Sequence, residues 1–145
     1  MYKHILIASD GSELAQRAAT QGLELAKLLK AKVTAVTVTE PWTSVVTGEM
    51  VLGFPYEEYE KTTAENAAAV LAGVAEAAKK MDLECATVHA KDQFPAEGII
   101  AAARDNGCDL TVMASHGRRG LAKLLLGSQA TKVLTLSTVP VLICR

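Results

Sequence analysis

The sequence predicts an α/β fold, a doubly wound, Rossmann-like parallel sheet of five strands with helices on both faces. Five short runs rich in aliphatic or β-branched residues alternate with helical patterns along the 145 residues. The intervening segments are long enough to cross over a sheet, as parallel strands require. The runs are apolar almost throughout, which indicates burial on both faces. We expect strands at residues 4–9, 32–39, 84–90, 109–115 and 139–144.

The first two helices are indicated by apolar residues at i, i+3 and i+4 spacings. The first lies between the first two strands, where Leu14, Ala18 and Leu25 share a face and Asp10 or Ser12 is available as N-cap. The second covers residues 56–81 and is rich in alanine, which favours helix and close packing.

The last two helices are shorter. One begins near Pro95, since proline suits a first turn, and ends at Asn106 and Gly107. The other spans residues 128–137 and places Ala130, Val133 and Leu134 on one face.

Length and composition restrict the class of protein. A chain of 145 residues, half of them apolar, has the size of one domain, so residues 1–145 are expected to form a single domain. The formal charge of −1 offers no electrostatic footprint for nucleic acid or an anionic membrane. No signal peptide or run long enough to span a bilayer is present, and three cysteines without CxxC spacing indicate a reducing compartment. A cytoplasmic protein is expected.

Residues 114–128 carry the strongest functional signal. An apolar run ends at Ala114 and Ser115, and Gly117 and Gly127 form two separated corners before a helical pattern. Glycine permits positive φ and close backbone approach, and Gly127-Ser128 at a helix start would offer N–H groups and a hydroxyl to an anion. The alternative is a glycine turn followed by a serine N-cap.

The spacing small-x-x-Gly, nine residues, then Gly-Ser after a strand resembles the nucleotide-binding signature of the universal stress protein family. The opening residues 3–12 and the closing residues 139–145 also look like that family's first and last strands, so the resemblance covers the whole chain. Ala114 stands where the family usually has glycine. Alanine restricts positive φ and adds a methyl group where the backbone approaches a ligand.

The resemblance implies the strand order 3-2-1-4-5 and a site for ATP with Mg2+. In such sheets a ligand lies beyond the carboxyl ends of the strands, where the winding reverses between the first and fourth strands. Residues 9–12 and 114–117 both lie there. The implied nucleotide-binding residues are Asp10, Val38, Met113, Ala114, Ser115, Gly117, Gly127, Ser128 and Gln129.

Several of these residues have a structural alternative. Asp10 would accept hydrogen bonds from ribose or adenine or hold a cation, or it would simply cap the first helix. Val38 lines an adenine pocket or packs in the core. Arg118 and Arg119 are candidate cations beside the phosphates or solvate the loop. His116 titrates near phosphate or is satisfied by backbone groups.

Two further segments are unusual. Residues 41–55 form a long apolar connection that would close over the ligand as a lid, bury against a second subunit, or contain a short helix that packs on the core. The last strand lies at a sheet edge, whose unpaired backbone groups favour a homodimer. The resemblance implies antiparallel pairing around Val139, Val141 and Ile143.

The leading hypothesis is therefore a cytoplasmic, homodimeric, ATP-binding stress-response regulator. No Walker A sequence or evident arginine finger is present, so we expect binding with at most slow hydrolysis and no catalytic residues. One alternative is an interaction protein of the same fold with a vestigial nucleotide site, which Ala114 favours. Another is an adenylate-processing enzyme, although Ser9-Asp10-Gly11-Ser12 does not match the Ser-Gly-Gly-x-Asp-Ser loop of such enzymes.

Overall fold

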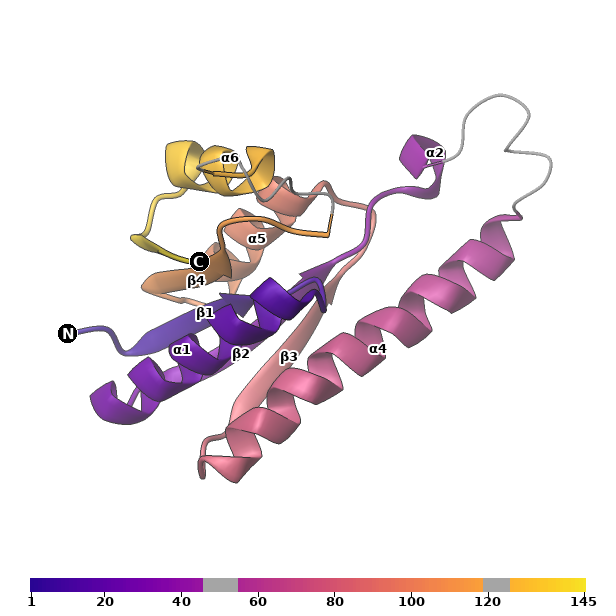
Figure 1. The fold of residues 1–145 in the computed structure, drawn as a ribbon. Helices are drawn as coiled ribbons and strands as arrows, with labels where there is room; N and C mark the ends of the chain where they lie inside the picture. The colour runs from indigo at the N-terminus through magenta and orange to yellow at the C-terminus, as the bar shows by residue number, and fades with distance from the viewer. Residues whose placement is uncertain (46–54, 119–125) are drawn as a thin grey trace.

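The computed structural model describes residues 1–45, 55–118 and 126–145 and contains a five-stranded parallel sheet (Figure 1). The strands are β1 (His4–Ala8), β2 (Lys32–Val38), β3 (Cys85–Ala90), β4 (Leu110–Ala114) and β5 (Val141–Cys144). Their order is β3-β2-β1-β4-β5, so the predicted fold class and strand order are confirmed. The winding direction reverses between β1 and β4, which pair in parallel.

Helices cover both faces of the sheet, as predicted. The long helices α1 (Glu13–Leu29) and α4 (Tyr56–Lys80) pack on one face, and α5 (Pro95–Asp105) and α6 (Ser128–Leu136) on the other. Successive residues of β1 alternate between the two cores: Ile5 and Ile7 join the α1 and α4 side, whereas Leu6 joins the α5 and α6 side. This central strand is buried from Ile5 to Ala8, and its polar loop is therefore held at a fixed place at its carboxyl end.

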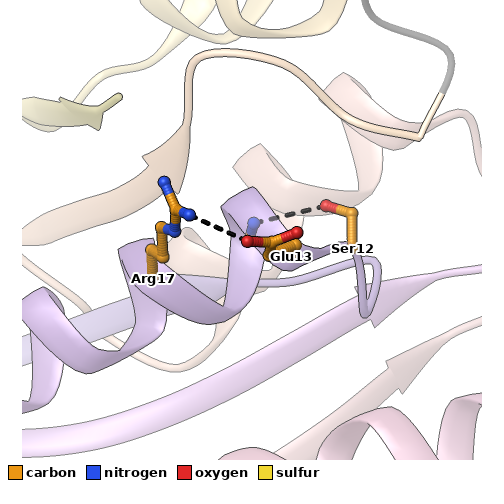
Figure 2. A network of polar contacts seen from close by, with 4 residues as sticks. Ser12, Glu13 and Arg17 are labelled. Atoms are coloured by element: carbon orange, nitrogen blue, oxygen red, sulfur yellow. Dashed lines mark hydrogen bonds and ion pairs between the residues drawn. The ribbon is translucent and has the colours of Figure 1, made fainter.

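Ser12 is the N-cap of α1. Of the two residues predicted for this role, Asp10 and Ser12, the second is therefore correct. The Ser12 hydroxyl accepts a hydrogen bond from the Ala15 backbone N–H at 3.2 Å. An exposed ion pair between Arg17 and Glu13, at 2.8 Å, lies on the next turn (Figure 2). The helix therefore begins immediately after the β1 loop and directs its positive end toward that loop.

The predictions at α6 and β5 were partly wrong. The N-cap of α6 is Gly127, not a serine, and Leu134 is 42% exposed instead of facing the core with Ala130 and Val133. The last strand begins at Val141. Val139 precedes it, because the Ser137 hydroxyl bonds both the N–H and the carbonyl of Val139 and so forms a local turn.

Only part of the apolar connection at residues 41–55 can be described. It begins with one turn of helix, α2 (Trp42–Val45). A short helix is therefore present, but none of its residues is buried, so it does not pack into the core as the predicted alternative required. Residues 46–54 lie outside the described residues. The Trp42 ring meets Tyr56, the first residue of α4, edge to face at 5.9 Å. Across the described ranges, no helix is both long and apolar enough to cross a membrane.

Candidate functional site

A cleft of about 730 Å³ opens at the carboxyl ends of β1, β2 and β4, beside the β1–β4 switch point. The loops after these strands form its walls together with α2 and the starts of α4, α5 and α6. Elements far apart in the sequence therefore meet around one cavity of a size that suits a small ligand.

All nine residues predicted to bind nucleotide line this cleft. They are Asp10, Val38, Met113, Ala114, Ser115, Gly117, Gly127, Ser128 and Gln129. Arg118 also lines it, and Arg119 lies outside the described residues. The structure thus brings the predicted set together around one cavity.

The two glycine corners are needed for close approach and not for positive φ. Neither Gly117 nor Gly127 has φ in the left-handed region, contrary to one reason given for glycine there. The Gly127 N–H donates to the Ser115 carbonyl at 2.7 Å, and a Cβ at Gly127 would lie 2.9 Å from that same oxygen. Glycine therefore lets the start of α6 pack directly on the loop after β4.

The first turn of α6 faces the cleft with Gly127, Ser128, Gln129 and Ala130. Ser128 is exposed, and the free N–H groups of a helix start favour an anion. The Gln129 side chain has a structural task, because its Oε1 accepts a hydrogen bond from the Ala96 N–H at 3.1 Å. Gln129 thereby fixes α6 against the start of α5.

Ala114 is accommodated without backbone strain. It is the last residue of β4 and pairs with Cys144 in the parallel ladder. Among the described residues other than glycine, positive φ occurs only at Lys30, Asp82 and Asp92. Position 114 does not require positive φ, so alanine fits its backbone conformation. Alanine here differs from glycine only in its buried methyl group, which lies at the wall of the cleft.

Asp10 neither caps α1 nor has a carboxylate free of protein contacts. Its Oδ1 accepts a hydrogen bond from the Ser12 N–H at 2.9 Å, and its Oδ2 accepts one from the Arg118 N–H, also at 2.9 Å. The cap of α1 is Ser12 itself. Asp10 therefore connects the loop after β1 to the loop after β4.

One alternative for His116 was that backbone groups satisfy its ring nitrogens. The hydrogen bonds of the ring do not support it. Its Nδ1 lies 3.0 Å from the Ser115 hydroxyl. Its Nε2 is buried and has no hydrogen-bond partner within the described part of the chain. A buried ring nitrogen without a partner is costly, by roughly 1–3 kcal/mol.

Sequence reasoning missed the side of the cleft formed by α4 and by the segment after β2, where Thr39, Glu40, Tyr59 and Thr63 lie. The Tyr59 hydroxyl donates to the Glu40 carbonyl at 2.6 Å, and the pKa of Tyr59 is raised by burial and then by the charge of Glu40. Thr39 and Glu40 lie at the carboxyl end of a predicted strand, and this position could have indicated that they lie at the ligand edge of the sheet. The α4 residues had no local signal, because their place depends on how α4 packs.

The cleft has an apolar part and a part that offers groups suited to an anion. Buried or partly buried apolar side chains from β2, β4 and α5, namely Val38, Met113 and Ile99, line one part. The start of α6 and the Arg118 loop line another. Such a cavity can bind a ligand that has a flat apolar group at one end and negative charge at the other.

Comparison with known proteins places the chain among relatives of one kind. The family model described as "Universal stress protein family" matches residues 1–145. A curated relative, "Universal stress protein YxiE" from Bacillus subtilis, is 31% identical over 151 residues, which cover 100% of both chains. The resemblance stated from the sequence motifs is therefore confirmed.

Solved structures share the fold. The structure of MJ0577 from Methanocaldococcus jannaschii has a TM-score of 0.78 at 28% identity and covers 99% of this chain and 96% of that one. A universal stress protein in complex with cAMP has a TM-score of 0.74 at 24% identity, covering 99% and 97%. One from Archaeoglobus fulgidus in complex with dAMP has a TM-score of 0.73 at 19% identity, covering 99% and 98%.

Proposed function

The chain belongs to the universal stress protein family, and we propose that it binds ATP, with Mg2+, in the cleft at the carboxyl end of its sheet. One observation carries the proposal: the cleft joins an apolar section to a helix start that offers backbone N–H groups. An adenine ring suits the first and a polyphosphate the second.

The proposed contacts follow from this division. Val38 and Met113 would pack against adenine. The first turn of α6 and Ser128 would donate hydrogen bonds to the phosphates, with the Arg118 side chain as a nearby cation. Gly127 allows the phosphate loop and α6 to approach each other closely. Two of the structurally similar proteins are named as complexes of cAMP and dAMP, both of which contain adenine and a phosphate.

Mg2+ would be held mainly by the nucleotide. The described residues contain no group of three or more His, Cys, Asp or Glu side chains able to hold a metal ion. Mg2+ commonly keeps several waters and binds through phosphates with one or two carboxylates. The cation would therefore enter with ATP and neutralise phosphate charge.

We further propose that the protein acts in the cytoplasm as a homodimeric regulator of the stress response. Support for the dimer comes from β5, which is an edge strand in the sheet order. The predicted interface residues Val139, Val141 and Ile143 pack partly against the core beside α5 and α6, whereas Leu142 on the opposite face is 39% exposed. Pairing of two β5 backbones would cover both edges.

The second candidate function is that of an interaction protein without a working nucleotide site. The observation that favours it is the methyl group of Ala114 at the wall of the cleft, in the position where the family usually has glycine. Such a protein would work through its dimer surface at β5, where Leu142 is exposed, and through the apolar connection at residues 41–55, of which 46–54 lie outside the described residues.

Calorimetric titration of the purified, nucleotide-stripped protein with ATP and Mg2+ separates the two functions. We expect saturable binding that weakens for AMP, which lacks two phosphates, and for GTP, which carries a different base. Absence of heat at millimolar ATP, together with an unshifted melting temperature, would reject the nucleotide function and favour the interaction protein.

A further inference from the structure

We propose that Asp10 is a positioning residue that ties the two loops of the cleft together, instead of a direct contact to the nucleotide. The expected effect of Asp10 on ATP affinity rests on the proposed function, whereas its effect on the loop does not. We call the Asp10 carboxylate with its two backbone donors, the N–H groups of Ser12 and Arg118, the loop latch.

The geometry of the loop latch supports a positioning role for Asp10. Each carboxylate oxygen of Asp10 accepts one backbone N–H at 2.9 Å, from Ser12 on Oδ1 and from Arg118 on Oδ2. Hydrogen bonds to an ionised acceptor are about twice as strong as neutral ones. The second bond joins residues 108 positions apart, so it holds two separate loops together.

Gly117, which lies beside the loop latch, supports the same role for Asp10. A Cβ at Gly117 would lie 2.8 Å from Oδ2 of Asp10, the oxygen that accepts the Arg118 N–H. Gly117 does not have φ in the left-handed region, so its backbone would tolerate alanine. What requires glycine at this corner is the space that the Asp10 carboxylate occupies.

The loop latch fixes the segment that leads from β4 toward the proposed phosphate site. In this segment the Ser115 carbonyl accepts a hydrogen bond from the Gly127 N–H at the start of α6. The Arg118 N–H donates a hydrogen bond to the Asp10 carboxylate. Without the latch, a nucleotide would have to order this loop as it binds, and the entropic cost would lower its affinity.

The first experiment measures amide hydrogen exchange in the nucleotide-free protein. Arg118 is exposed, so protection of its amide depends on Asp10. In Asp10→Ala and in Gly117→Ala, we expect exchange at this amide to be at least about tenfold faster. The matched control is Ser12→Ala, which removes the α1 cap but keeps its backbone N–H, and should leave Arg118 exchange unchanged.

The second experiment compares affinities for ATP and 2′,3′-dideoxy-ATP, which lacks the ribose hydroxyls. We expect Asp10→Ala to weaken both by a similar factor, on the order of tenfold, because the loop and not the ribose is affected. A ribose contact at Asp10 would instead weaken ATP alone. Asp10→Asn keeps the size of the side chain and one acceptor oxygen, so its affinity should lie between those of wild type and Asp10→Ala. If the alanine variant does not fold, Asp10→Asn takes its place in the comparison.

The outcomes separate this inference from the proposed function. If wild type binds no ATP, the nucleotide function fails, and Arg118 exchange still decides whether the loop latch exists. Unchanged Arg118 exchange in both Asp10→Ala and Gly117→Ala would overturn the inference. So would an affinity loss for ATP that is absent for the dideoxy analogue.

Discussion

Substitution of Gly127 is the sharpest test of the proposed phosphate site. An alanine Cβ would lie 2.9 Å from the Ser115 carbonyl oxygen, whereas ordinary contact begins at 3.4 Å. The start of α6 must therefore retreat by about 0.5 Å, which breaks or lengthens the 2.7 Å hydrogen bond from the Gly127 N–H. The φ of −70° suits alanine, so the backbone itself is not strained.

The effect on stability should be small and that on binding large. Loss of one hydrogen bond costs about 1 kcal/mol, and replacement of glycine by alanine offsets roughly 0.4–1 kcal/mol through the unfolded chain. The retreat of α6 misplaces N–H groups that would donate to the phosphates, and a hydrogen bond to a charged group contributes about 1.5–3 kcal/mol. We therefore expect Gly127→Ala to weaken ATP binding by about 10-fold to 100-fold and Gly127→Val, whose side chain is larger, to abolish it.

The assay is calorimetry with ATP and Mg2+, with circular dichroism and thermal unfolding to establish that each variant is folded. Gly73→Ala on α4 is the matched control, because nothing lies within 4 Å of its added Cβ. It should stabilise the protein by roughly 0.5–1 kcal/mol and leave ATP affinity unchanged. Wild-type affinity in a folded Gly127→Val would refute the assignment of the phosphates to the start of α6.

Further predictions concern packing, pH and assembly. Gly98→Ala would place a Cβ 2.8 Å from both methyl groups of Val38, so we expect a loss of about 1–3 kcal/mol in urea unfolding; wild-type stability would show that β2 and α5 can separate at no cost. Burial lowers the pKa of His4 and His89 below 6.5, so the unfolded chain binds protons more readily and the melting temperature should fall as pH drops below about 6.5. A variant with glutamine at both positions that keeps the same pH dependence would contradict this. Leu142→Lys on the edge strand should lower the dimer fraction in analytical ultracentrifugation without unfolding the protein, and an unchanged dimer would place the interface elsewhere.

Much of the fold was predictable because it depends on local patterns. The five strand positions follow from apolar runs, and the helices that separate them follow from i, i+3 and i+4 spacing. The strand order, in contrast, was supplied by a family resemblance, since periodicity does not say which strands are neighbours. The predicted cleft residues were found together because the carboxyl ends of parallel strands meet at one edge of the sheet.

By itself, the sequence determined which segments form strands and helices and which loop carries the small-residue corners. Only the tertiary structure decided what those corners are for. It joined Asp10 to Arg118 and made glycine at 117 and 127 a matter of space instead of backbone conformation. These facts depend on atoms that meet between different loops of the cleft, 108 positions apart for Asp10 and Arg118. Local periodicity contains no record of such distances, because it reports only how each segment divides its surface between core and solvent.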